Sequence, residues 1–502
     1  NITASGGSQI FAGIQISGDS LRDRILRWLD PIDVQLVQDR LRMQHTPATG
    51  EAFLHDEFND WLKSNCRRLW LHGEAGSGKT FLSSLLIDQM PNLLSELDQA
   101  EIRQRAIAYF YCSFQNKGTR EAMSFLKSIN AQLLIKHENS EKVSRSLTLV
   151  IDGLDEVRSG GPQNQFLSVL NDLAKKENPH FRVIIFSRMQ AIIRNPLKTA
   201  LGWKPLSRDI GQIERDIDLL ALQQISQRAV LGDYQILIQH GLPEKSTFLI
   251  YSRFRLAALQ IQELCDCTET HDTLDEKVIV ELLNKLPREL DPFYDRIVAG
   301  IPQILQRPLE SALRWLTFAT RPLYVEELIE ACTIKDNITG TPSTVGQQII
   351  DITTVAERLR GMVEIQQALS LPYLELQKRT YTVQFVHQTV KEYLSPVTNF
   401  DRPAGRLRFD DAIAHKHLAQ CCLAYLSYCA DKQDGSSSAC SFCFYSWHFW
   451  PTHFITSKHP KTPKARLDLD SVRLHNSMIH PDLYETSSST HVQAAETAFQ
   501  FE

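Results

Sequence analysis

The sequence predicts an α/β core in which helices cover both faces of a parallel sheet, followed by helical and winged-helix domains. Three observations carry this prediction. Between residues 67 and 208, short apolar runs alternate with helical stretches at the spacing of strand–helix–strand units. After about residue 210 the strand pattern fades and helical periodicity dominates. Alternation then returns in TYTVQFV (380–386), directly before a helical pattern in HQTVKEYL (387–394), which favours a small winged-helix-like domain.

A chain of 502 residues is too long for a single hydrophobic core and predicts several domains. The pattern along the chain divides it into seven segments. These are a linker or weak β segment (1–20), a helical segment before the α/β core (21–66), the α/β core (67–208), a helical domain (209–290), a winged-helix-like domain (291–400), a C-terminal helical segment (401–455) and a poorly ordered tail (456–502).

The composition is typical of a globular protein, with 43% hydrophobic and 23% charged residues. The net charge of −5 gives no electrostatic reason to expect nucleic-acid binding. No apolar run is long enough to cross a bilayer, and no secretory signal is visible. The ten scattered cysteines suit reduced, buried thiols, so a cytoplasmic location is expected. Because the chain begins at Asn1 rather than Met, the sequence leaves open that it is a fragment of a longer protein.

The stretch LWLHGEAGSGKTFL (69–82) contains the spacing G-x-x-x-x-G-K-[ST] between a predicted strand and a predicted helix. Glycines let the backbone amides face phosphate oxygens, and the helix amino terminus adds a favourable dipole. Lys79 is expected to reach the β- and γ-phosphates, and the hydroxyl of Thr80 to bind Mg²⁺. The predicted phosphate loop comprises Gly73, Glu74, Ala75, Gly76, Ser77, Gly78, Lys79 and Thr80. This pattern indicates a P-loop NTPase core.

An acidic residue at a second strand end is expected to complete the metal site. In LTLVIDGLDEV (147–157), Asp152 ends an apolar run, where ligands bind in open α/β sheets. Asp152 is therefore the predicted Mg²⁺ partner, directly or through water. Asp155 or Glu156 is a candidate for orienting or deprotonating the attacking water; the alternative is that both cap the next helix.

Arg188 follows a third buried run, FRVIIFS (181–187). An arginine at such a strand end is able to contact a γ-phosphate and so to report its presence. The alternative is a surface arginine at the start of a loop.

Together, GEAGSGKT (73–80), VIDGLDEV (150–157) and IIFSR (184–188) resemble the NACHT class of STAND ATPases, most closely the fungal NLR-like proteins that often carry ankyrin repeats. Segments 28–62, 286–298, 313–331 and 385–394 are similar to other parts of that family. The resemblance covers about residues 21–455.

The resemblance implies a switch that is closed with ADP, oligomerises with ATP and is reset by slow hydrolysis, commonly in cell-death or non-self responses. It implies ATP/ADP and Mg²⁺ as cofactors, a homo-oligomer on activation, and effector and trigger proteins that the sequence does not name. In the family, the histidine of the pattern F-x-H-x-x-x-x-[ED]-[YF]-L contacts the β-phosphate of ADP. His387 occupies that position in this chain; the alternative is a core histidine.

Other interpretations stay open. A turnover P-loop kinase or ATPase is one. Another is a scaffold protein whose nucleotide pocket no longer works. Only about a dozen residues separate INAQLL (129–134) from LTLVIDG (147–153), so the absence of a helix that covers the sheet stays open. Cys440, Cys443, His448 and His453 have a spacing that resembles a zinc knuckle. Residues 1–18 have the alternation of a β-assembly segment, although a flexible linker is favoured.

Overall fold

The computed structural model divides into two compact units, residues 1–290 with 369–376 and residues 291–368 with 377–502. It describes residues 9–11, 14–16, 21–64, 66–95, 105–138, 146–157, 161–175, 181–199, 202–241, 253–269, 275–336, 342–345, 350–367, 381–395, 407–431 and 441–457. Most of the predicted tail and Cys440 lie outside the described part of the chain, so the structure does not test the predictions about them.

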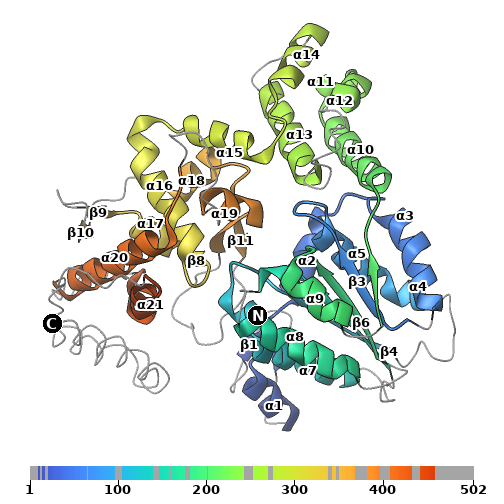
Figure 1. The fold of residues 1–502 in the computed structure, drawn as a ribbon. Coiled ribbons are helices and arrows are strands. Elements are labelled where there is room, and N and C mark those ends of the chain that lie inside the picture. The colour runs from blue at the N-terminus through green and yellow to red at the C-terminus, as the bar shows by residue number, and fades with distance from the viewer. Residues whose placement is uncertain are drawn as a thin grey trace, which may run out of the picture. The chain divides into compact units, whose positions relative to one another are not determined.

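The first unit is built on a five-stranded sheet in the order β4-β5-β6-β3-β7, with every neighbouring pair parallel. The strands are β3 (Arg68–His72), β4 (Arg105–Tyr111), β5 (Ser146–Asp152), β6 (Phe181–Ser187) and β7 (Trp203–Leu206). The apolar runs of β3, β4, β5 and β6 are buried on both faces, as parallel strands under helical layers require. Helices pack against both faces of the sheet (Figure 1). The predicted α/β core is therefore confirmed.

The helices that accompany the sheet begin with an amino-terminal group. These are α1 (Leu21–Leu29), α2 (Gln35–Gln44), α3 (Glu51–Phe53), a π-helical turn (Leu54–Phe58) and α4 (Asn59–Lys63). The crossover helices follow: α5 (Lys79–Ser95), α7 (Ala122–Glu138), α8 (Gly161–Lys175) and α9 (Ala191–Thr199), with 3₁₀ turns at Lys117–Arg120 and Leu154–Glu156. A short antiparallel hairpin, β1 (Gln9–Phe11) and β2 (Ile14–Ile16), precedes them.

The helix predicted before the short connection to residue 147 is present and complete. Helix α7 is 17 residues long, packs against β4 and leads to β5, which pairs with β4 along its whole length. Whether a further covering helix is missing between α7 and β5 stays untested, because residues 139–145 lie outside the described part of the chain.

A helical bundle completes the first unit. It consists of α10 (Ile210–Ser226), α11 (Ala229–Gly232), α12 (Gln235–Gly241), α13 (Arg253–Glu269) and α14 (Glu276–Lys285). These helices share their own apolar core, which includes Ala221, Ile225, Ile261 and Ile279. Helix α10 begins with a capping box, in which Asp209 and Gln212 each bond the other's backbone amide.

The second unit combines helices with small antiparallel sheets. Its helices are α15 (Leu290–Ala299), α16 (Gln303–Phe318), α17 (Val325–Ala331), α18 (Ile352–Arg358), α19 (Gln388–Leu394), α20 (Asp411–Asp431) and α21 (Cys443–Thr456). Strands β8 (Leu323–Tyr324), β11 (Val363–Gln367) and β12 (Tyr381–Phe385) form one sheet in the order β11-β12-β8, and β9 (Ile334–Asp336) pairs with β10 (Pro342–Val345). The winged-helix interpretation of this segment stays a prediction.

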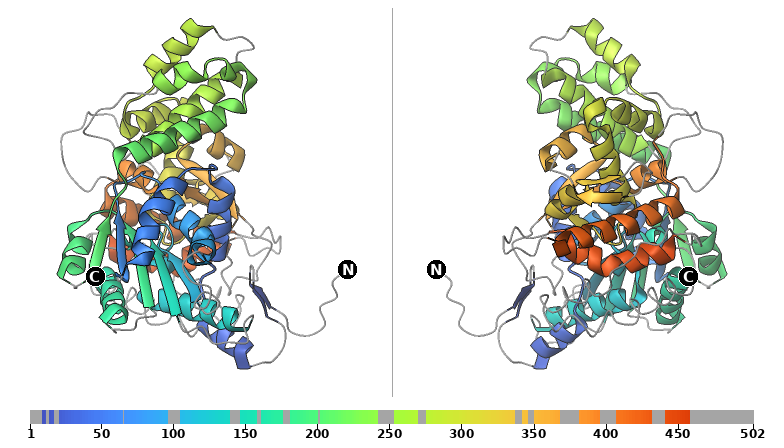
Figure 2. Two further views of the ribbon diagram at one scale, coloured as in Figure 1. Left: turned by 90° about the vertical axis from the view of Figure 1, so that its right-hand side faces the viewer. Right: turned by 90° about the vertical axis from the view of Figure 1, so that its left-hand side faces the viewer.

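Helices α20 and α21 lie side by side (Figure 2) and enclose a buried polar cluster. His453, which is fully buried, contacts the Tyr445 hydroxyl through Nε2 at 2.9 Å and Nδ1 of His415 through its own Nδ1 at 2.7 Å. The Tyr445 hydroxyl also accepts the backbone amide of Thr320 at 2.9 Å. This cluster joins the end of α16 to the last two helices.

Candidate nucleotide site

The predicted phosphate loop lies between β3 and α5 and is built around left-handed glycines. Gly76 and Gly78 have φ angles of +74° and +82°, which non-glycine residues rarely adopt. Gly73 is close to Ser77, because a Cβ at Gly73 would lie 2.9 Å from the Ser77 hydroxyl oxygen. The sequence thus folds into a tight loop that ends at the amino terminus of a 17-residue helix.

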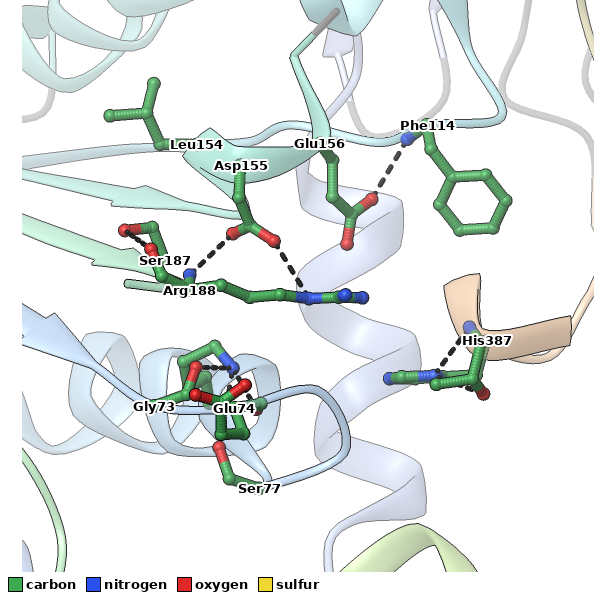
Figure 3. Close-up of polar contacts among 12 residues, drawn as sticks. Gly73, Glu74, Ser77, Phe114, Leu154, Asp155, Glu156, Ser187, Arg188 and His387 are labelled. Atoms are coloured by element: carbon green, nitrogen blue, oxygen red, sulfur yellow. Dashed lines mark hydrogen bonds and ion pairs between the residues drawn. The ribbon is translucent and has the colours of Figure 1, made fainter. Parts of the chain in front are cut away.

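Lys79 begins α5, and its ammonium group lies over the loop. Its Nζ donates to the carbonyl oxygens of Gly73 at 2.9 Å and Glu74 at 2.6 Å (Figure 3). Burial lowers the pKa of Lys79, and the negative charge of Asp155 opposes that shift. The ammonium group is therefore held within reach of an anion on the loop.

Asp152 ends β5 and is buried beside the start of α5. Its carboxylate is hydrogen-bonded to the side chain of Thr80. Burial raises the pKa of Asp152 to about 7, although Thr80 and Lys79 act in the opposite direction. Mg²⁺ prefers oxygen ligands, and at nucleotide sites phosphates and waters supply most of them. The hydroxyl of Thr80 and the adjacent carboxylate of Asp152 are suitable protein ligands for such an ion. The described residues contain no group of three His, Cys, Asp or Glu side chains placed to hold a metal by themselves.

Asp155 and Arg188 form an ion pair at the ends of β5 and β6. The backbone amide of Arg188 donates to Asp155 Oδ1 at 2.9 Å, and Arg188 Nε lies 3.2 Å from Oδ2 (Figure 3). The Arg188 side chain is 16% exposed and that of Asp155 is 4% exposed, so the pair is largely shielded from water. Arg188 is therefore not a loosely held surface arginine, and Asp155 serves first as its partner.

Glu156 differs from Asp155 in its surroundings. Its Oε2 accepts the backbone amide of Phe114 at 2.9 Å (Figure 3). Burial, then the neighbouring Asp155, raise the pKa of Glu156 to about 8. A carboxyl group with a pKa near neutrality suits general acid–base chemistry better than an ordinary carboxylate.

The loop, Asp152, the Asp155–Arg188 pair and Glu156 all gather at the carboxyl edge of one sheet. Sequence reasoning missed the amide of Phe114, because a backbone donor has no side-chain signature. It also missed Arg208, two residues beyond β7, where no strand was predicted.

His387 belongs to the second unit and is the N-cap of α19. Its Nδ1 accepts the backbone amide of Thr389 at 3.2 Å, and the Thr389 hydroxyl lies 3.0 Å from the same nitrogen. Since Nδ1 acts as an acceptor, the neutral ring carries its hydrogen on Nε2. His387 therefore has a donor nitrogen opposite its capping nitrogen.

The described part of the zinc-knuckle pattern does not gather as a metal site. His453 is bonded to His415 and Tyr445, the Cys443 thiol is hydrogen-bonded to Cys429, and Nδ1 of His448 contacts the carbonyl of Phe444. The described residues give the zinc interpretation no support.

The parallel sheet order and the phosphate loop after the interior strand β3 define a P-loop NTPase fold. Residues 48–145 and 137–188 match the family model described as Nephrocystin 3, N-terminal. The chain is 26% identical over 256 residues to azaphilone pigments biosynthesis cluster protein L of Monascus ruber, covering 48% of this chain and 50% of the relative. It is 24% identical over 392 residues to vegetative incompatibility protein HET-E-1 of Podospora anserina, covering 67% of this chain and 25% of the relative.

The chain thus spans half the length of one of these curated relatives and a quarter of the other. The matches confirm the predicted resemblance to fungal NACHT-type NTPases. Among solved structures, it is similar to the Aeropyrum pernix ORC1 protein in complex with DNA (TM-score 0.30, 12% identity, 69% of this chain and 91% of that one) and to a point mutant of Thermotoga maritima RuvB (TM-score 0.28, 14% identity, 54% and 78%).

Across the described stretches of the chain, no helix combines the length and apolar character that a membrane crossing demands.

Proposed function

We propose that the chain is a nucleotide-controlled signalling switch of the NACHT type, which binds ATP and ADP with Mg²⁺. Slow ATP hydrolysis returns it to an ADP-bound closed state. The observation that best supports this proposal is that Lys79, the Thr80–Asp152 pair and the Asp155–Arg188 pair lie together at one edge of the sheet. The likeness to a vegetative incompatibility protein supports a role in fungal non-self recognition, innate immunity or programmed cell death.

Each group has a role in this proposal. The loop amides and Lys79 bind the phosphates, and Thr80 and Asp152 hold Mg²⁺, which neutralises phosphate charge when bound. Arg188, oriented by Asp155, contacts the γ-phosphate and distinguishes ATP from ADP. Glu156 accepts the proton of the attacking water, since its carboxylate bonds a backbone amide through Oε2, whereas both oxygens of Asp155 are engaged by Arg188.

His387 is proposed as the latch of the closed state. Its N-cap role favours the tautomer with hydrogen on Nε2, which is the form that donates to a phosphate oxygen. A donor on the second unit stabilises only an arrangement in which that unit meets the nucleotide. With ATP the latch is released and the chain forms a homo-oligomer that engages its effector.

The test is to purify the protein without added nucleotide, denature it and identify what is released. Near-stoichiometric ADP supports the switch, and Lys79→Ala should release none. An empty protein that turns over ATP rapidly would instead indicate a metabolic kinase or ATPase. An empty protein that neither binds nor hydrolyses nucleotide would indicate a scaffold.

A further inference from the structure

Arg208 lies between β7 and α10, and its guanidinium is buried and held from one side. The side chain is 7% exposed. Its Nη2 donates to the carbonyl oxygen of Gln212 at 3.1 Å and forms an ion pair with Asp216. Its Cζ lies 5.8 Å from the centre of the Phe53 ring. These contacts set the direction of the guanidinium plane.

Asp216 connects Arg208 to a distant part of the chain. One carboxylate oxygen pairs with Arg208, and the other accepts the backbone amide of Gly50 at 3.0 Å. The turn at Gly50 is itself tight against α5, since a Cβ at Gly50 would lie 3.0 Å from Leu82. Arg208 is thus positioned by a carboxylate that also binds the turn before α3, and that turn packs against the phosphate-loop helix.

The Nε and Nη1 groups of Arg208 have no hydrogen-bond partner among the described residues. Nε is buried without a hydrogen bond, and every hydrogen bond recorded for Arg208 uses Nη2. Nη1 lies 3.8 Å from the position that a Cβ would occupy on Gly78, the last glycine of the loop, and is the nearest heavy atom to it. A buried cation with unused donors beside a phosphate loop matches an anionic oxygen, because guanidinium donors favour phosphate.

The sheet order places this arginine opposite Arg188. Strand β3, which leads into the loop, lies between β6 and β7. Arg188 directly follows β6, and Arg208 follows β7 after one intervening residue. The two arginines therefore approach the loop from the strands on either side of it.

We propose that Arg208 is a nucleotide-binding residue that donates Nη1–H to a phosphate oxygen of the nucleotide held by residues 73–80, and that Asp216 is its positioning residue. This inference rests on the proposed nucleotide function. It assigns the β7–α10 junction a direct part in phosphate binding, which makes the start of the helical bundle responsive to the nucleotide.

The test measures the ADP dissociation constant of the full chain with Mg²⁺ by calorimetry. Loss of one charged hydrogen bond should make Arg208→Gln bind ADP about 10–100-fold more weakly. Arg208→Lys, which keeps the charge but loses the fork, should lie in between. A matched control is Arg182→Gln. Arg182 also lies over an aromatic ring (Trp61, 5.1 Å) and bonds a carbonyl (Leu62, 3.2 Å), but it is at the opposite end of the sheet. The Arg182→Gln variant should have the same ADP dissociation constant as the parent protein.

The positioning role predicts a non-additive double variant. Asp216→Asn should weaken ADP binding, whereas Asp216→Asn added to Arg208→Gln should cause little further loss, because both changes remove the same contact. Melting temperatures without nucleotide verify that each variant folds.

Two outcomes contradict the inference in distinguishable ways. If Lys79→Ala abolishes ADP binding while folded Arg208→Gln and Arg208→Lys bind within about twofold of the parent, the Arg208 assignment is wrong and the nucleotide site stands. If the parent itself binds neither ADP nor ATP, the proposed function fails, and the Arg208 inference fails with it.

Discussion

At the scale of single residues, neighbouring carboxylates acquire different chemistry from their partners. Asp155 has both oxygens engaged by Arg188. The side chain of Glu156, the next residue, bonds only the amide of Phe114 among the described residues. The adjacent acids that the sequence left equivalent therefore differ: one is bound by an arginine through both oxygens, and the other is bound by one backbone amide.

Glu156→Gln should slow ATP hydrolysis by about 10²–10⁴-fold, because the amide cannot accept a proton from water. The affinity for ADP should change by less than about threefold, since Glu156 does not bind phosphate in this assignment. Single-turnover hydrolysis and ADP calorimetry measure the two quantities. Glu276→Gln, an exposed change on α14, is the control. Unchanged hydrolysis in Glu156→Gln would remove Glu156 from the mechanism.

His453 predicts a loss of stability in acid. Burial, and then His415, lower the pKa of His453 to about 3. The unfolded chain therefore takes up a proton below pH 6.5 that the folded chain does not bind. The contribution to the free energy of unfolding is complete above pH 6.5 and declines by about 1.4 kcal/mol per pH unit below it.

Urea unfolding at pH 7.5, 6.5 and 5.5 measures this effect. Tryptophan emission is the readout, and Trp315, whose ring centre lies 6.2 Å from that of His453, contributes to it from the relevant unit. His453→Gln should flatten the decline between pH 6.5 and 5.5, whereas the exposed control His55→Gln should keep it. Parallel pH profiles for the parent and His453→Gln would show that another group controls acid stability.

At the scale of elements, the turn after β5 depends on a single glycine. Gly153 has φ +71°, and a Cβ there would lie 2.7 Å from the carbonyl oxygen of Cys112. That carbonyl belongs to the segment after β4, so the contact is between backbones and cannot be relieved by rotating a side chain. The tight approach brings Asp155 and Glu156 back over the sheet edge.

Gly153→Ala should lower the free energy of unfolding by about 2–4 kcal/mol, through the left-handed φ and the backbone clash together. The matched control is Gly232→Ala in α11, where a Cβ meets nothing within 4 Å. That change should be neutral or slightly stabilising. Urea midpoints of the nucleotide-free proteins measure both. Equal midpoints for the two variants would mean that the turn after β5 relaxes freely.

The sequence predicted four of the five strands in the sheet, because β3, β4, β5 and β6 are apolar runs buried on both faces. It missed β7, whose residues Trp203–Leu206 include a lysine and a proline and are only half-buried. An edge strand with one neighbour needs no continuous apolar run. Missing β7 also hid Arg208, since its position beside Gly78 depends on pairing between β7 and β3.

The candidate site was likewise predictable only in part from the sequence. The loop, Asp152 and Arg188 were predictable because each lies at the end of a recognisable strand. The Asp155–Arg188 pairing and the Phe114 amide were not, since they depend on how two or three segments meet after folding.

At the scale of the whole molecule, the chain consists of two units, and the proposed switch requires them to respond to one nucleotide. The first contains the loop and both arginines, and the second contains His387. A protein that keeps its phosphate site and its latch on separate bodies is able to change state without unfolding either one.

His387→Ala should release ADP faster and form larger species with ATP, because the closed state loses a contact. ADP dissociation is measured by chase with unlabelled nucleotide, and mass by light scattering after gel filtration. His55→Ala, on an exposed side chain, should resemble the parent. A His387→Ala protein that retains ADP equally long and stays monomeric with ATP would refute the latch.

The position of β3 between β6 and β7 has a consequence for the synthesis of the protein. Strand β3 is completed by residues 181–187 on one side and 203–206 on the other, both made long after it. The phosphate loop therefore leaves the ribosome well before the strands that hold it in shape. A nascent chain that stops before β7 lacks an edge of the nucleotide site, so it should emerge unable to bind nucleotide and with β3 exposed to chaperones. We therefore expect nucleotide binding only after β7 has been synthesised, when the helical bundle is the next part of the chain to emerge.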